Sequence, residues 1–232
     1  MNQIKMKQWL KERDITCEES FADALYRLAV EHKRKHNCTL DEIWKELGIS
    51  RQNVYYWRKH SNSMMTQVIK KHCVIEHTAE LFGLTALETE QLANKAGLAR
   101  LTEYFQDENN ELFSKIFNEK LATWKGKQRI LYEHVGMHKA TFYRIKQGEN
   151  LRKEVILALF ITMDLSLSEI QQCLRAAGYC LSFSLPVDLL ICYLLDHDLK
   201  EMSGFERLHI INDLLYELDQ PLLETIQVKE LP

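Results

Sequence analysis

The chain has 232 residues, which is enough for one large domain or two small ones. Hydrophobic residues make up 46% and charged residues 27%, a globular balance that argues against a disordered chain. With 8 Gly and 3 Pro, the chain is poor in the tight turns of a β-sandwich or β-barrel, which favours helices joined by short loops. No run reaches the roughly 18–20 apolar residues of a membrane span, and the six cysteines form no CxxC pair. We therefore expect a cytoplasmic protein with reduced thiols and no membrane partner.

The net charge of −3 hides an uneven distribution. Residues 45–72 carry six Lys or Arg against one Glu, and residues 120–153 carry nine against two. Residues 183–232 reverse the balance, with three Lys or Arg against ten Asp or Glu. Two basic islands and an acidic tail suit a protein that presents one face to a polyanion.

A short helix follows Thr39, which has Glu42 at the spacing of a capping box. Gly48 supplies a residue for a turn with positive φ, and Ser50 is predicted to cap the next helix. The predicted inward positions are Ile43, Trp44, Leu47, Val54 and Trp57, and the outward ones are Arg51, Gln52, Asn53, Tyr55, Tyr56 and Arg58.

The stretch 98–110 is predicted to hold a helix (Leu101, Tyr104, Phe105) followed by a polar Asp-Glu-Asn-Asn turn. A second unit then repeats the plan and turns at Gly136. The predicted inward positions are Leu131, Tyr132, Val135, Phe142 and Ile145, and the outward ones are Lys139, Thr141, Tyr143, Arg144 and Lys146.

Two pairs of segments reveal an internal duplication. Leu47–Lys59 aligns without gaps to Val135–Gln147 at an offset of 88, and Phe82–Leu98 aligns to Met163–Tyr179 at an offset of 81. The second repeat is thus seven residues shorter between the two blocks. Both segments of the second pair have a capping box at the start of a helix and a glycine after it. These residues are Thr85 with Glu88 before Gly97, and Ser166 with Glu169 before Gly178.

Both units resemble the helix-turn-helix of the lambda-repressor/Cro family, a compact bundle of about five helices. Here the bundles would begin with helices over Phe21–Lys33 and Glu111–Lys125 and close with helices over Thr85–Lys95 and Ser166–Ala176. Residues 165–223 also resemble a C-terminal extension of bacterial and phage members. The likeness covers roughly residues 21–98 and 110–223. It implies an all-α fold of two tandem bundles plus C-terminal helices. The implied domains are 1–98 (core about 21–98), a helical linker over 99–110, a second helix-turn-helix domain over 111–182, and an acidic helical extension over 183–232.

The resemblance implies a sequence-specific DNA-binding transcriptional regulator of phage or mobile-element type, a repressor that occupies promoter DNA. The second helix of each motif fits the major groove, where Arg reads guanine and Asn or Gln reads adenine. The implied base readers are Arg51, Gln52, Asn53 and Tyr56 in the first unit and Lys139, Thr141 and Arg144 in the second. The implied phosphate contacts include Ser50, Gln128 and His138, while Arg58, Lys59, Lys127 and Lys146 add attraction to the DNA backbone, as do Lys70, Lys71, Arg129, Arg152 and Lys153.

The two units differ at one implied contact. Gln128 stands where the family often places a Gln that binds phosphate, whereas the first unit has Leu40 there. The second unit is therefore the better candidate for DNA binding. The alternative is a helix-turn-helix that serves only as a protein-interaction module.

Enzymatic chemistry has no support in the sequence, which contains no Gly-rich phosphate loop, G-x-S-x-G or HExxH. His32, His36 and Cys38 lie close together but lack a fourth ligand for structural zinc, so we expect no metal and no cofactor. The apolar stripes of residues 184–199 and 205–223 have two interpretations. They either pad the second domain or form a homodimer surface.

Overall fold

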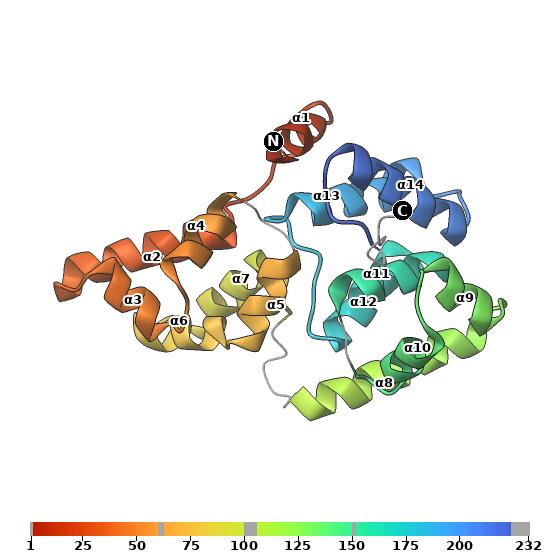
Figure 1. The fold of residues 1–232 in the computed structure, drawn as a ribbon, viewed down its shortest axis with the longest axis horizontal. Helices are drawn as coiled ribbons and strands as arrows, with labels where there is room; N and C mark the ends of the chain where they lie inside the picture. Colours follow the sequence, from red (N-terminus) through yellow and green to blue (C-terminus); the bar gives the residue numbers. More distant parts are fainter. Residues whose placement is uncertain (1, 60–62, 100–105, 150–151, 224–232) are drawn as a thin grey trace, which may run out of the picture. The chain divides into compact units, whose positions relative to one another are not determined.

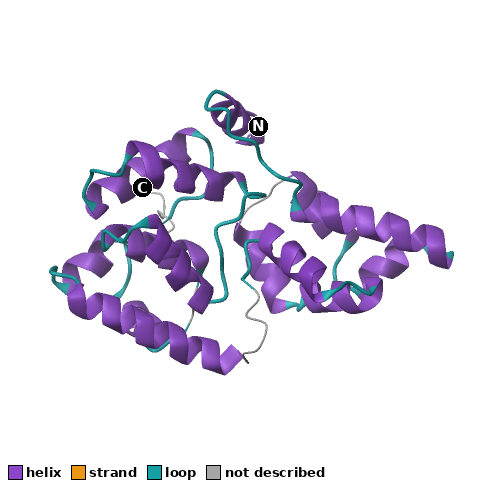
Figure 2. Ribbon diagram, turned by 180° about the vertical axis from the view of Figure 1, so that it is seen from behind, coloured by secondary structure: helices purple, strands orange, loops and turns teal. Residues whose placement is uncertain are grey.

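The structure, a computed structural model, describes residues 2–59, 63–99, 106–149 and 152–223. These residues form fourteen α-helices and one π-helical turn, with no strand among them, so the predicted all-α class is confirmed (Figure 2). None of these helices is both long and apolar enough to cross a membrane. The helices in chain order are α1 (Asn2–Lys11), α2 (Phe21–His36), α3 (Leu40–Glu46), α4 (Arg51–Lys59), α5 (Ser63–Lys71), α6 (Val74–Phe82), α7 (Ala86–Lys95), α8 (Gln106–Thr123), α9 (Gln128–His134), α10 (Lys139–Lys146), α11 (Lys153–Thr162), α12 (Leu167–Ala176), α13 (Pro186–Tyr193), the π-helical turn Leu194–Asp198, and α14 (Gly204–Glu217).

The chain divides into two compact units. Unit 1 comprises residues 1–100 and 181–189, and unit 2 comprises residues 101–180 and 190–232. The C-terminal segment, expected as one extension from residue 183, is thus shared between the units.

The core of unit 1 is organised around α2, against which α3, α4, α6 and α7 all pack (Figure 1). Its buried stripe includes Phe21, Leu25 and Ala29, each with no exposed surface. Ser20 caps this helix by accepting a hydrogen bond from the backbone N–H of Asp23 at 3.1 Å. A helix that the sequence analysis did not predict, α1, buries Met6, Trp9 and Leu10.

The turn of each motif adopts the predicted left-handed conformation. Gly48 and Gly136 both have φ of +69°, a region in which a side chain would be strained. The next residue closes the turn in both units: the Ile49 N–H donates to the Trp44 carbonyl at 3.0 Å, and the Met137 N–H donates to the Tyr132 carbonyl at 2.7 Å. The chain reversal between α3 and α4 therefore recurs between α9 and α10.

Unit 2 is built on an aromatic core. The rings of Phe113, Phe117, Phe142 and Phe160 contribute from α8, α10 and α11, and each side chain is buried. The Phe117 centroid lies 6.0 Å from that of Phe142 and 5.9 Å from that of Phe160, both in edge-on geometry. This cluster fixes α8, α10 and α11 to one another.

The duplication extends through both bundles, and α5 accounts for the length difference. At the offset of 81, α6 corresponds to α11 and α7 to α12. Both α6 and α11 end before a residue with φ of +63°, Gly83 in one and Asp164 in the other. Unit 1 has α5 between α4 and α6, whereas unit 2 passes from α10 directly to α11 in the described residues.

An apolar surface on every side distinguishes α11 from α6. Residues 155–163 are all buried, whereas α6 leaves Glu76, His77 and Glu80 exposed. A helix that is hydrophobic all round needs neighbours on every side, and α14 packs against α11 as the additional layer. Leu208, Ile211 and Leu215 form the buried face of α14.

The predicted polar turn at residues 107–110 is wrong, because α8 already begins at Gln106 and runs through these residues. The expected helix around Leu101, Tyr104 and Phe105 lies outside the described residues.

Candidate nucleic-acid interface

The second helix of the motif in unit 2, α10, has one buried and one exposed face. Phe142 and Ile145 have no exposed surface, as predicted. Lys139, Tyr143 and Arg144 are exposed. Of the other predicted outward residues, Thr141 and Lys146 are half-buried. The helix thus presents a cationic and aromatic face.

Side chains of α8 hold the C-terminal end of α10. The carbonyl oxygen of Lys146 accepts a hydrogen bond from the Ser114 hydroxyl at 2.6 Å and another from the Asn118 side-chain amide at 3.0 Å. Asn118 also donates to the Ser114 carbonyl at 2.7 Å. These bonds satisfy a helix-terminal carbonyl and fix the orientation of α10 relative to α8.

Two lysines of α10 lie near the ring of Tyr143. The ammonium nitrogens of Lys139 and Lys146 lie 5.8 Å and 5.4 Å from the centroid of Tyr143. The guanidinium of Arg144 pairs with the Glu149 carboxylate at 3.1 Å, and both side chains are more than half exposed. An exposed pair of this kind contributes little free energy, so Arg144 can exchange its partner for a ligand at small cost.

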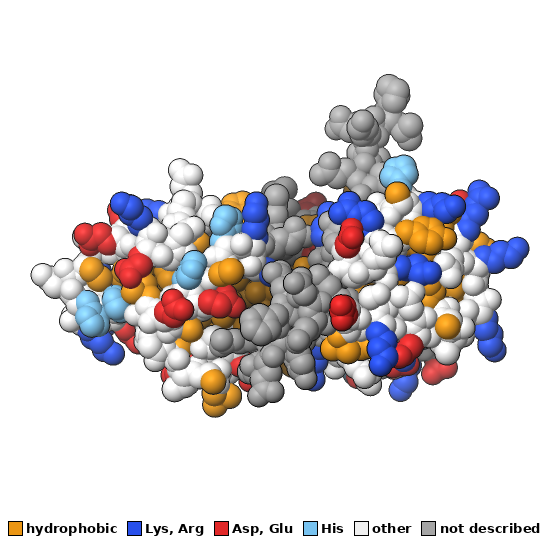
Figure 3. All heavy atoms as spheres, turned by 90° about the horizontal axis from the view of Figure 1, so that it is seen from below, with side chains coloured by type: hydrophobic (Ala, Val, Ile, Leu, Met, Phe, Trp, Pro, Cys, Tyr) orange, Lys and Arg blue, Asp and Glu red, His pale blue; other side chains and the backbone are white. Residues whose placement is uncertain are grey.

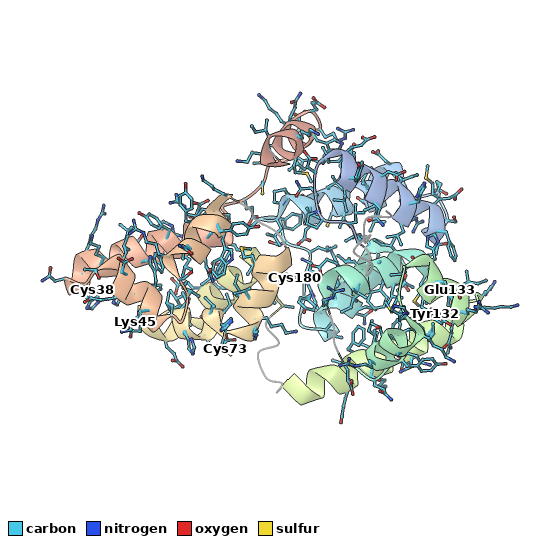
Figure 4. The ribbon with its side chains drawn as sticks, viewed as in Figure 1. Cys38, Lys45, Cys73, Tyr132, Glu133 and Cys180 are labelled. Atoms are coloured by element: carbon cyan, nitrogen blue, oxygen red, sulfur yellow. The ribbon has the colours of Figure 1, made fainter. Side chains whose placement is uncertain are left out.

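The start of α9 holds the other predicted DNA contacts of unit 2. Lys127 and Gln128 are exposed, as the proposed phosphate contacts require. Arg129 instead pairs with Glu133 at 2.7 Å on the same helix. Figure 4 labels Glu133 and the neighbouring Tyr132, whose ring lies 5.5 Å from that of Phe142 and so ties α9 to α10. His138 is exposed at the N-cap of α10, where its side chain makes no capping hydrogen bond.

In unit 1, α4 is anchored by Val54 and Trp57, both 3% exposed. The Trp57 ring packs 6.2 Å from that of Phe21 on α2. The outer surface of α4 is more aromatic than that of α10, since Tyr55 is 61% exposed and Tyr56 is 46% exposed. Arg51, Gln52 and Lys59 are exposed as predicted, and the Lys59 ammonium lies 4.5 Å from the Tyr55 centroid.

Two of the predicted DNA contacts in unit 1 take part in capping. The Ser50 hydroxyl accepts a hydrogen bond from the Asn53 N–H at 3.1 Å and donates to the Asn53 side-chain oxygen at 2.9 Å. Asn53 is half-buried, as Thr141 and Lys146 are in unit 2. Both polar groups are therefore partly occupied within the helix start.

A third predicted contact, Arg58, bridges α4 to α2. Its guanidinium donates to the Asp23 carboxylate at 2.8 Å and lies 4.5 Å from the Tyr26 centroid. Partial burial of Asp23 raises its pKa, but hydrogen bonds from Ser20 and Arg58 outweigh it and hold the pKa below its ordinary value. The carboxylate is thus ionised and keeps Arg58 oriented. The sequence analysis missed this pair because its partners lie 35 residues apart.

The remaining chemistry-bearing residues do not assemble into a metal or thiol site. Among the described residues, no group of three or more His, Cys, Asp or Glu side chains is placed to hold a metal ion. The His32 ring stacks on His36 at 4.2 Å and packs against Phe82 at 5.3 Å. None of the six cysteines, all of which lie in the described part of the chain, forms a disulfide, and Cys38 and Cys73 of unit 1 lie well apart (Figure 4). Burial raises the pKa of the Cys173 thiol to about 11, which leaves it un-ionised at neutral pH.

Charge on the molecular surface is mixed. Figure 3 shows Lys and Arg side chains projecting from both parts of the chain with acidic side chains between them.

Comparison of the chain with models of known protein families, with curated proteins and with solved structures gave no significant match. The sequence repeat and the geometry of the two motifs are therefore the observations that bear on function.

Proposed function

We propose that this protein is a sequence-specific DNA-binding regulator that contacts duplex DNA through α10, and also through α4. The observation that carries the proposal is the repeated helix–turn–helix, in which a second helix anchored by two buried residues carries a polar or cationic outer face. Such a helix has the dimensions to enter the major groove.

Unit 2 is the stronger reader in this proposal. Its α10 offers Lys139 and Arg144 to base edges, while Gln128 and Lys127 at the start of α9 are exposed for phosphate. Ser114 and Asn118 add a positioning role, because they hold the end of α10 in place. A fixed helix loses less conformational entropy on binding than a mobile one.

A protein-interaction role is the second candidate, and unit 1 favours it. Tyr55 and Tyr56 give α4 an exposed aromatic surface, and tyrosine is enriched in protein interfaces. Leu40 replaces the phosphate-binding glutamine, while Asn53 and Arg58 already have partners in unit 1. In this division, unit 2 reads DNA and unit 1 recruits a partner.

We also propose homodimerisation through the C-terminal helices, but only part of the α14 surface is open to such a contact. The apolar stripe of α14 is buried against α11, so the interpretation that it pads unit 2 has direct support. A dimer contact on α14 would have to use its outer face, where Tyr216 is 75% exposed. Repression by occupying promoter DNA is the expected mode of action.

The test is selection of duplexes from a random-sequence pool, followed by fluorescence anisotropy with the enriched sequence. We expect Arg144→Ala to weaken binding by about ten-fold or more, because one bidentate base contact contributes about 1–3 kcal/mol. Lys115→Ala is the matched control, since Lys115 is an exposed cation of unit 2 outside the motif. If both variants bind as wild type does, α10 is not the reading helix.

A further inference from the structure

A cleft of about 380 Å³ opens in unit 1 between α2, the start of α3, and α4. Its volume lies within the range of about 300–1,000 Å³ that is usual for small-molecule sites. The cations Lys33, Arg51 and Arg58 line it together with the aromatic residues Tyr26, Trp44 and Tyr55, and Asp41 is its one acidic wall residue. Positive charge and flat apolar surface are thus combined in one concave site.

The walls of this cleft are held in place by contacts within unit 1. Arg58 is fixed by its 2.8 Å bond to Asp23 and by the Tyr26 ring beneath it. Tyr26 in turn stacks on Trp44, with centroids 6.4 Å apart and an interplanar angle of 26°. The charge of Arg58 is offset by Asp23, so Lys33 and Arg51 are the cations that favour an anionic ligand here, and the aromatic rings favour a ligand with a flat ring.

Unit 2 fills the corresponding region. At the offset of 88, Val54 on the cleft wall is replaced by Phe142, whose ring packs against Tyr132 and Phe117. Lys33 is replaced by Leu121, which is 6% exposed. Unit 1 thus has a smaller residue at one of these positions and a more polar one at the other, whereas Tyr26 and Trp44 on the cleft wall are larger than their counterparts Ser114 and Tyr132.

We propose that this cleft binds a small anionic ligand with a flat ring, of the size of a nucleoside monophosphate, and that the bound ligand controls access to α4. The phosphate would pair with Arg51 and Lys33, and the ring would lie against the Tyr55 and Trp44 side. Since Arg51 lines the cleft and is also a predicted base reader, one side chain would serve either the ligand or DNA, but not both at once. Control of DNA binding rests on the proposed function, whereas ligand binding itself does not.

Ligand binding is tested first, without DNA. The full chain is titrated by calorimetry with AMP, GMP, CMP and UMP, with adenosine and inorganic phosphate as control ligands. We expect at least one nucleotide to saturate with a Kd below about 1 mM, and neither the nucleoside nor phosphate alone to match it. If no nucleotide saturates, or if inorganic phosphate binds equally well, the proposal is overturned.

Matched variants then locate the site. Arg51→Gln, an exposed change, should weaken nucleotide binding by about ten-fold. Gln52→Ala, next to it on α4 but outside the cleft lining, and Lys139→Gln, its counterpart in unit 2, should leave nucleotide affinity unchanged. If Lys139→Gln weakens binding as much as Arg51→Gln does, the cleft is not the site. Displacement of DNA by the nucleotide is measured last. If the nucleotide binds but does not displace DNA, only the proposed control of DNA binding is refuted.

Discussion

Individual side chains at helix starts contribute much of the local definition of this fold. The Glu169 carboxylate accepts hydrogen bonds from the Ser166 N–H at 2.9 Å and hydroxyl at 2.7 Å, and it also pairs with the Lys120 ammonium at 2.6 Å. One carboxylate thus caps α12 and ties it to α8. The hydrogen bond from Lys120 is the largest cause that lowers the pKa of Glu169 from 4.5 to about 2, and Ser166 contributes further.

The first prediction concerns acid stability. Because the pKa of Glu169 is lower in the folded protein, its ionised form stabilises unit 2 fully above about pH 4.5, and this contribution is lost as the pH falls toward 2. We expect Glu169→Gln to remove most of this pH dependence from urea unfolding followed by circular dichroism. Glu88→Gln is the matched control, since Glu88 caps α7 in the same way but its pKa is lowered by hydrogen bonds from Thr85 rather than by a lysine. Equal acid sensitivity of Glu169→Gln and wild type would contradict this account.

A second prediction at this scale concerns the α10 anchor. The double variant Ser114→Ala/Asn118→Ala removes both of these donors to the Lys146 carbonyl, and we expect it to lower the free energy of unfolding by about 2 kcal/mol. If α10 reads DNA, affinity should fall as well, because the helix loses its fixed orientation. Lys115→Ala on the same helix should change neither quantity. A stable double variant would show that the aromatic core alone positions α10.

At the scale of elements, the local signals gave correct helix starts. The capping boxes predicted at Thr39, Thr85 and Ser166 are all present, and the predicted Gly97 and Gly178 both have positive φ after their helices. Each of these signals depends on residues within a few positions of one another, which explains why the sequence alone revealed them.

Features that depend on distant partners were not predictable in this way. The short apolar pattern of α1 indicates a helix only once Met6, Trp9 and Leu10 are known to be buried. The Arg58–Asp23 pair and the cleft beside it require α2 and α4 to be placed together. The role of α14 likewise follows from the all-round apolar surface of α11, which is separated from it in the chain by α12 and α13.

The docking of α14 on α11 leads to a third prediction. A Cβ at Gly204 would lie 2.3 Å from the Ile161 carbonyl oxygen and 2.6 Å from that of Thr162. Because the obstacle is backbone, Gly204→Ala should displace the start of α14 and cost about 2 kcal/mol of unfolding free energy, measured by urea titration. Asp213→Ala, an exposed change on the same helix, is the control. An unchanged midpoint for Gly204→Ala would mean that α14 does not approach α11 this closely.

For the whole molecule, the duplication has produced two units with the same turn and different surfaces. Unit 2 pairs a filled aromatic core with a cationic α10, whereas unit 1 combines an aromatic α4 with an open cleft. The sequence repeat predicted the shared architecture, because the turn glycines recur at an offset of 88 and the later capping residues and glycines at an offset of 81. The different surfaces depend on substitutions such as Val54 for Phe142, whose effect only becomes visible when neighbouring helices are in place.

The central claim is that the second helix of at least one motif reads duplex DNA. The most direct measurement is anisotropy with a duplex selected from random sequences and with a scrambled control, at several salt concentrations, for wild type, Arg51→Ala and Arg144→Ala. We predict tighter binding to the selected duplex, an affinity that falls steeply as salt rises, and a larger loss for Arg144→Ala than for Arg51→Ala. Failure of the selection to enrich any sequence, with the folded protein showing no preference at low salt, would contradict the claim and leave the protein-interaction role in its place.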